Sequence, residues 1–457
     1  MRTGFLGALV ALVAGSGLAP GQTADMLPPP RMVPAAPAAD SETMTADVTT
    51  GSVPADMAVP EGSPFTVPGT DGHPAAHSRL WFSAEYLLWW FKGQQVPALV
   101  TTGPAVTVLV PGPVVPFGPP PLVPVPSPFA GAVGTNGTKV LFGAGEINED
   151  SRSGGRFTGG WWLDDAHSCA VEGSYFFLGE RTNQSLFGPE LSVLARPFFD
   201  LNTGAEAAAL VTFPGQSRGS VLVSAPSELW GTEANVLKKL CACDCHYQID
   251  WLTGVRFLDL KEDIAITQTQ DLSTGLLPGA EFFPLAGQHL VLTDRFATEN
   301  RFYGGQFGLD LACYCGPWAL EVRGKLGLGD THEDLAVIGS QAATTAGGKT
   351  TVASAGLLAL PTNSGRFSQD EFAVLPEATV HVGYRVCDWL CLFTGFDLLY
   401  WSQVVRPGDQ IDRVIDVSQV PNFAPAAVPT GVPRPATQFK QTDFWAAGID
   451  FGMEFVW

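Results

Sequence analysis

The order of the connections along this chain constrains its fold more than any other feature, because long connections alternate strictly with short ones. They separate segments in which apolar residues alternate with small or polar ones, the period-two pattern of a β-strand with two different faces. In an antiparallel sheet, such an order puts every tight turn at one end and every long loop at the other. The segments are residues 80–91, 155–163, 169–178, 228–240, 247–257, 300–312, 318–329, 377–386, 390–401 and 444–457.

The last segment shows the two faces most clearly. Its odd-numbered positions, from Trp445 to Trp457, carry apolar side chains, whereas its even-numbered positions include Asp450 and Glu454. A tilted strand needs about 9–11 residues to cross a bilayer, which is close to the length of these segments. Lipid offers no partner to backbone N–H and C=O groups, so a sheet in a membrane has to close on itself. We therefore predict an all-β fold: a closed antiparallel transmembrane β-barrel of about ten strands in the outer membrane of a Gram-negative-type envelope.

The connections predict which end of this barrel faces which compartment. Outer-membrane barrels have short periplasmic turns and long external loops. Residues 103–134 are rich in proline, which lacks the backbone donor, so we expect no regular sheet pairing there. A secreted β-sandwich is the competing fold, but it does not explain the sorting of loops by length. The short connections would be residues 164–168, 241–246, 313–317 and 387–389, and the long ones 92–154, 179–227, 258–299, 330–376 and 402–443.

The start of the chain has the pattern of an export signal. One positive charge at Arg2 precedes a short apolar run and a small-residue exit, which predicts a signal peptide over residues 1–24. Residues 25–78 are rich in Pro, Ala, Ser and Thr without periodicity, so we predict a disordered linker. The barrel would then occupy residues 79–457.

Aromatic residues near the segment ends are candidates for anchors at the membrane interfaces. The aromatic strand that ends at Trp457 is also the expected contact of the barrel-assembly machinery, and outer-membrane lipid is the other expected partner. A net charge of −20 argues against nucleic acid as a partner, because phosphates would be repelled. The predicted anchors are Trp81, Trp89, Trp90, Trp161, Trp162, Trp230, Trp318, Trp389, Tyr400, Trp401 and Trp445.

Several stretches resemble the outer-membrane porins of beta-barrel porin family seven. They are WFSAEYLLWW at residues 81–90, VTT at 100–102, LFG at 141–143, SGGRF at 153–157 and GWWLD at 160–164. The resemblance extends over most of residues 79–457, although beyond the second strand it is mainly one of pattern. It implies the barrel fold and the outer membrane, and it implies no substrate and no catalytic residues.

Charged residues on the small or polar faces are predicted to line the lumen. Two interpretations stay open: an ion-paired interior that stabilises the barrel, since eight strands already fill with side chains, or a small pore in which the acidic excess favours cations. The predicted lumen residues are Glu85, Arg156, Glu172, Glu233, Asp250, Arg256, Asp310, Glu321, Arg323, Lys325, Glu377, Arg385, Asp397, Asp450 and Glu454.

The eight cysteines all lie at or beside the four short turns. Exported proteins form disulfides, so bridges that tie the periplasmic rim together are the leading prediction. Metal binding at residues 241–246 (CACDCH) is the alternative, although zinc sites favour wider spacing, and free or lipid-modified thiols remain open. The cysteines are Cys169, Cys241, Cys243, Cys245, Cys313, Cys315, Cys387 and Cys391.

The sequence contains no pattern that indicates catalysis. His381 beside inward carboxylates, His167, and His332 among acidic residues are candidates for acid–base chemistry, and structural or solvated roles are favoured for them. We expect no enzyme activity, no cofactor and no metal site. The leading function is that of a porin-like or structural outer-membrane barrel with a narrow acidic lumen, a candidate route for small cations or solutes. The alternative is a surface interaction or adhesion protein whose barrel displays the long external loops.

Overall fold

The computed structural model describes residues 79–111, 122–127, 129–243, 247–273, 287–420 and 432–457. The chain divides into two units, residues 1–57 and 58–457, and the described residues all belong to the second. The predicted signal peptide and linker therefore lie outside the described residues. Among those described, no helix combines the length and the apolar character needed to cross a membrane.

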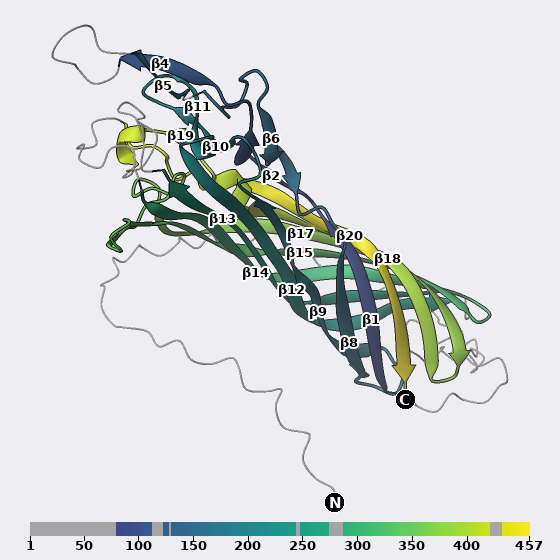
Figure 1. Ribbon diagram of the computed structural model, residues 1–457. Coiled ribbons are helices and arrows are strands. Elements are labelled where there is room, and N and C mark those ends of the chain that lie inside the picture. Colours follow the sequence, from purple (N-terminus) through teal and green to yellow (C-terminus); the bar gives the residue numbers. More distant parts are fainter. Residues whose placement is uncertain (1–78, 112–121, 128, 244–246, 274–286, 421–431) are drawn as a thin grey trace, which may run out of the picture. The chain divides into compact units, whose positions relative to one another are not determined.

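Ten strands of the described chain close into one antiparallel barrel, as predicted. Each strand pairs with the next along the chain, and the last pairs with the first, from Trp81 opposite Val456 to Phe91 opposite Ala446. Figure 1 shows these strands running side by side at a common slant. They are β1 (Leu80–Phe91), β8 (Arg152–Trp162), β9 (Cys169–Phe187), β12 (Ser217–Cys243), β13 (Tyr247–Leu272), β14 (His289–Cys315), β15 (Trp318–Thr344), β17 (Gly365–Cys387), β18 (Leu390–Val405) and β20 (Gln441–Val456).

The middle strands are much longer than predicted. β12 to β15 have 26 or 27 residues each, so most of the predicted loop 258–299 is strand. The sequence pattern underestimated these lengths because the polarity of the two faces reverses along a single strand. Below Phe257, the outward side chains of β13 other than Thr253 are apolar or aromatic; above it, Lys261 is outward and exposed while Leu260 and Ile264 are buried inside. An outward face is apolar in lipid and polar in water, so this reversal indicates that the upper part of the wall stands in water while the alternation continues.

Three of the four short connections are described, and they lie at one end of the barrel. Two of them are tight, with Gly316 and Pro317 joining β14 to β15, and Asp388 and Trp389 joining β17 to β18. In the turn 163–168, the hydroxyl and the amide of Ser168 donate to the Asp164 carboxylate, and these hydrogen bonds lower the pKa of Asp164. The first and last strands of the barrel also meet at this end, where the Leu80 and Trp457 backbones exchange hydrogen bonds of 3.1 and 3.2 Å.

The long connections fold at the opposite end, where Figure 1 shows their strands gathered above the barrel wall. We call the described parts of residues 92–151, 188–216, 345–364 and 406–440 the cap. Its largest sheet joins β3, β6, β10, β11 and β19, and β2 pairs with β7. The bounds are β2 (Gln94–Val96), β3 (Val100–Thr102), β6 (Lys139–Phe142), β7 (Gly145–Ile147), β10 (Leu194–Asp200), β11 (Ala205–Thr212), β16 (Thr350–Ala353), η1 (Pro407–Gln410), β19 (Val414–Ile415) and η2 (Val417–Gln419).

One expectation about this region is wrong. Residues 103–134 do contain paired strands, because β4 (Thr107–Pro111) and β5 (Leu122–Pro126) form a two-stranded antiparallel sheet. The prolines are tolerated because of the register: Pro111, Pro124 and Pro126 all fall in alternate pairs of the ladder. In every second pair of an antiparallel ladder, the backbone nitrogens point away from the partner strand, so a proline there removes no hydrogen bond of the ladder. A two-stranded ribbon has two free edges, which is where prolines are accommodated.

The cap packs onto the upper inner wall through a common apolar core. Buried residues of the cap, such as Phe198 and Leu358, join inward-facing barrel residues such as Ile264, Phe296 and Leu335 in one cluster. This core explains why the inward face of the upper wall is apolar, although the lower lumen is charged.

The tryptophans divide between the two faces of the wall, which corrects part of the predicted anchor set. Trp81, Trp89, Trp162 and Trp401 are at most 4% exposed and point inward, so they are not interfacial anchors. Successive residues of a strand face opposite sides, so only one member of Trp89–Trp90 or Trp161–Trp162 can reach lipid. The outward and exposed tryptophans are Trp90, Trp161, Trp251, Trp318, Trp389, Trp445 and Trp457.

Candidate functional site in the barrel lumen

The lower lumen contains a band of charged side chains on inward-facing strand positions. The predicted lumen residues all lie on this inner face, and all but Arg156, Glu233, Arg323 and Arg385 are buried as whole residues. The following side chains contact one another, and we call them the ionic layer: Glu85, Arg156, Glu172, Glu233, Arg256, Asp310, Glu321, Arg323, Lys325, Glu377, His381, Asp397 and Asp450.

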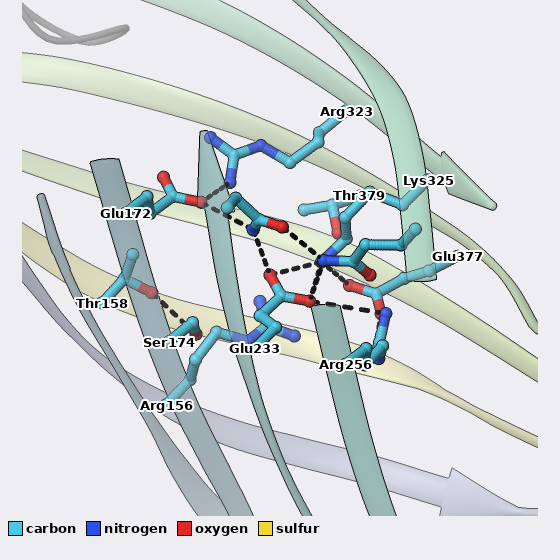
Figure 2. Close-up of polar contacts among 12 residues, drawn as sticks. Arg156, Thr158, Glu172, Ser174, Glu233, Arg256, Arg323, Lys325, Glu377 and Thr379 are labelled. Atoms are coloured by element: carbon cyan, nitrogen blue, oxygen red, sulfur yellow. Dashed lines mark hydrogen bonds and ion pairs between the residues drawn. The ribbon is translucent and has the colours of Figure 1, made fainter. Parts of the chain in front are cut away.

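Lys325 and Arg256 form the most compact group of the ionic layer with two glutamates. Lys325 Nζ lies 2.9 Å from Glu233 and 2.8 Å from Glu377, and Arg256 pairs with the same two carboxylates. Figure 2 shows these four side chains converging from separate strands. Two cations thus balance two anions where water has little access.

Arg323 and Arg156 each form ion pairs with a further group of carboxylates. Arg323 lies 3.0 Å from Glu172, 2.7 Å from Asp310 and 3.4 Å from Glu321. Arg156 lies 3.0 Å from Glu85 and 3.1 Å from Asp397. Each arginine compensates more than one carboxylate, so acids outnumber bases in the ionic layer.

Neutral amides and hydroxyls complete the network, and the sequence analysis did not single them out. Gln306 donates to Glu233 at 3.1 Å and to Asn235 at 2.6 Å, and Thr379 donates to Asp397 at 2.7 Å. These residues lie on the same inward positions as the charges, so the alternation pattern was the signal that could have found them.

Apolar side chains lie on both sides of the ionic layer. Toward the short turns, Trp81 and Trp162 pack with Leu237 and Leu252. Toward the cap, a larger cluster crosses the lumen, which we call the apolar layer: Leu87, Trp89, Phe91, Phe176, Leu178, Leu229, Leu258, Leu260, Phe302, Ala373, Leu375, Leu399, Trp401, Val404, Phe444 and Ala446. The cavity lined by the ionic layer has a volume of about 60 Å³, which is room for a few water molecules.

A buried ion pair attaches the cap to the wall above the apolar layer. Arg406, which directly precedes η1, donates to both carboxylate oxygens of Glu262 on β13, at 2.8 and 2.7 Å. The same guanidinium donates to the carbonyl oxygens of Lys92 and Gly93 at 2.8 and 2.9 Å. Both charged side chains are at most 1% exposed. The predicted boundaries of the strands placed both residues in loops, so neither was considered.

Six of the eight cysteines can be described, and all six are free thiols. The predicted bridges are therefore not formed among Cys169, Cys241, Cys313, Cys315, Cys387 and Cys391. Cys391 points inward beside Tyr314 and Phe393, whereas Cys315 is exposed, so these two thiols lie on different faces of the wall. Cys245 and the side chain of Cys243 lie outside the described residues.

The three histidines weighed for catalysis occupy different surroundings. His381 lies in the ionic layer between Glu321 and Asp450. His167 is buried in a short turn and stacks on Trp162, with 5.2 Å between ring centroids. His332 lies on the outer wall of β15, with Nδ1 2.6 Å from Asp370 and Nε2 3.6 Å from Asp334.

A family model described as "Putative beta barrel porin-7" matches residues 121–457. No curated protein matches the chain. Among solved structures, the outer membrane protease OmpT from Escherichia coli is similar at 7% identity and a TM-score of 0.35, with 82% of this chain and 97% of that chain covered. The P. putida toluene transporter TodX is similar at 7% identity and a TM-score of 0.19, with 83% of this chain and 89% of that chain covered.

Proposed function

This chain belongs to the beta barrel porin-7 family, and we propose that it is a closed outer-membrane scaffold that carries a folded cap at the cell surface. The observation that carries the proposal is the apolar layer, which crosses the lumen between the ionic layer and the cap. The apolar layer consists of sixteen residues, among them Trp89 and Trp401, and a hydrated ion would have to lose its water to pass them. Moving a charge into apolar surroundings is strongly unfavourable.

The attachment of the cap supports the same proposal. Arg406 and Glu262 are fully buried, and Asp294 on β14 accepts hydrogen bonds from the Leu358 and Ala359 amides of the cap at 2.8 and 2.7 Å. Arg196 of the cap lies 2.6 Å from the same aspartate. Charged hydrogen bonds of this kind hold long connections in one conformation, which suits a surface that presents a defined shape to a partner.

A second candidate function is the passage of small cations. The excess of carboxylates in the ionic layer favours it, because rings of acidic side chains select cations in channels. Under this alternative, the apolar layer would have to open, and Asp250, Glu321 and Asp450 would be the candidates for selectivity.

The proposal assigns no reaction to the barrel. His381 is enclosed by the ionic layer, and His332 faces away from the lumen on the outer wall. A protease assay on intact cells that express the chain, with an His332→Ala variant as the comparison, would reveal an activity that depends on this exposed histidine. We expect no difference between the two.

Planar-bilayer conductance of the complete protein, folded in detergent, tests the closed lumen. We expect no discrete current steps from the native chain. A Trp89→Ala/Trp401→Ala variant removes the two largest side chains of the apolar layer and should conduct. The matched control is Trp318→Ala, which removes an outward tryptophan that is 53% exposed, and it should stay silent. Discrete cation-selective steps from the native chain would replace the scaffold proposal with the pore.

A further inference from the structure

Three side chains from separate strands meet inside the lower lumen: Glu85 of β1, His381 of β17 and Asp450 of β20. One ligand atom of each lies within 4.8 Å of the other two, and all three residues are buried. We propose that they bind one divalent transition-metal ion of the zinc type. The site is separate from the scaffold role and from the cysteine cluster considered above, because a closed barrel can exist with or without it.

The state of Asp450 is the first argument. Its side chain is 0% exposed, and its charged partner is the histidine of the same cluster, His381. Buried charges are normally paired with good geometry or coordinated to metals. The neighbouring His381 Nε2 lies 3.4 Å from Asp450 Oδ1, beyond the usual range of a charged hydrogen bond.

That separation is the second argument. Zinc holds nitrogen and carboxylate ligands at about 2.0–2.2 Å in a tetrahedron, so two of its ligand atoms stand about 3.3–3.5 Å apart. His381 Nε2 and Asp450 Oδ1 already have this spacing. Imidazole and carboxylate together form a donor set that suits zinc and its first-row neighbours.

The orientation of the histidine is the third argument. His381 Nδ1 lies 3.3 Å from Glu321 Oε2, and Arg323 lies 3.4 Å from the same carboxylate group. Metal-binding histidines commonly use their second nitrogen in this way, because a carboxylate partner fixes the ring and directs the other nitrogen to the metal. Glu321 would be a positioning residue for the site rather than a ligand.

Space and charge complete the case. Glu85 and His381 line the cavity of about 60 Å³, which has room for a water as a fourth ligand. Glycines keep the site open: a Cβ at Gly395 would come within 2.2 Å of His381 Cδ2, and one at Gly452 within 2.8 Å of Glu85 Cγ. A divalent cation would also offset the excess of carboxylates in the ionic layer.

The test uses the complete protein, purified in detergent, stripped with chelator and dialysed against Zn²⁺. We expect one tightly held zinc per folded chain by elemental analysis, and a higher temperature for loss of the folded electrophoretic band. Asp450→Asn keeps the shape of the side chain and should weaken zinc binding at least about 100-fold, and Glu321→Gln about 10–100-fold. His332→Gln, which alters a partly exposed histidine with two carboxylate neighbours, should bind like the native chain.

A folded native chain that retains no zinc would overturn the proposal, and so would an Asp450→Asn variant that binds zinc as tightly as the native chain. If the Asp450→Asn variant does not fold, the Glu321→Gln variant carries the test, because zinc held by the cysteines at residues 241–246 would not respond to that change. Substitution with Co²⁺ adds a direct readout, because its visible absorption reports a tetrahedral site with a histidine ligand. Loss of binding in His332→Gln would instead assign the metal to the outer wall.

Discussion

At the residue scale, the buried pair of Arg406 and Glu262 differs from the surface pairs around it. Its guanidinium satisfies both oxygens of one carboxylate and two backbone carbonyl groups. Lysine could not reproduce this contact, because a planar fork of donors is a property of arginine. Truncating one member of such a pair leaves the other charge buried without compensation, which is the costly case.

We therefore predict that Arg406→Leu lowers the free energy of unfolding by about 3–5 kcal/mol. Arg295→Leu is the control, since Arg295 pairs with Asp263 at 2.5 Å but is 52% exposed, and its loss should cost less than about 1 kcal/mol. Denaturant unfolding in detergent measures both, and protease sensitivity of the cap should rise only in Arg406→Leu. Equal costs for the two variants would mean that the cap is held by its apolar core alone.

At the scale of the elements, the strands carry two successive patterns on one continuous backbone. β13 and β14 remain paired residue for residue from Tyr247 opposite Cys313 to Asp271 opposite His289. Their outward faces nevertheless change from aromatic to charged beyond Phe257 and Tyr303, whose rings lie 4.9 Å apart. The backbone pairing is thus the same in both parts of the wall, and only the outward side chains differ between the lipid-facing part and the part above it.

The two ends of these strands predict an orientation in the membrane. Gly347 lies in the turn that joins β15 to β16 on the cap side, and Ala166 lies in the short turn between β8 and β9. In a cysteine-free background, a thiol introduced by Gly347→Cys should react with an impermeant reagent on intact cells. One introduced by Ala166→Cys should react only after the outer membrane is opened. The opposite pattern would reverse the topology, because short turns would then face outward.

At the scale of the whole barrel, the lumen is stratified into an aromatic floor, the ionic layer, the apolar layer and the core shared with the cap. The outside is stratified as well, and its apolar zone defines where the bilayer lies. Val380 on β17 and Ile338 on β15 are both outward and 39% and 42% exposed, but only Val380 lies in the lower, lipid-facing part of the wall.

This placement predicts a difference between two like substitutions. Val380→Arg puts a charge into lipid and should make the free energy of folding into bilayers less favourable by about 2–4 kcal/mol, whereas Ile338→Arg should change it by no more than about 1 kcal/mol. Refolding titrations into lipid vesicles measure both values. A large cost at Ile338 would extend the bilayer over the upper wall and contradict the assignment of that wall to water.

Much of the barrel was predictable from the sequence because the patterns that indicate its strands and turns are local. Period-two alternation and connection length identified the ten strands, their order and the end at which they turn, and they identified the positions of Glu321 and Asp450 as inward. Each of these depends only on neighbours along one strand. The limits of β12 to β15 were missed because the polarity of the two faces exchanges above the membrane.

Only the tertiary structure decided which of these residues meet. Glu85, His381 and Asp450 are far apart in sequence, and they come together because closure pairs β1 with β20 and places β17 across β18. The same is true of Arg406 and Glu262, which join a loop to a distant strand. Alternation tells which face a side chain occupies, but its height in a tilted, closed wall depends on the register of every strand, and the register is a property of the complete ring.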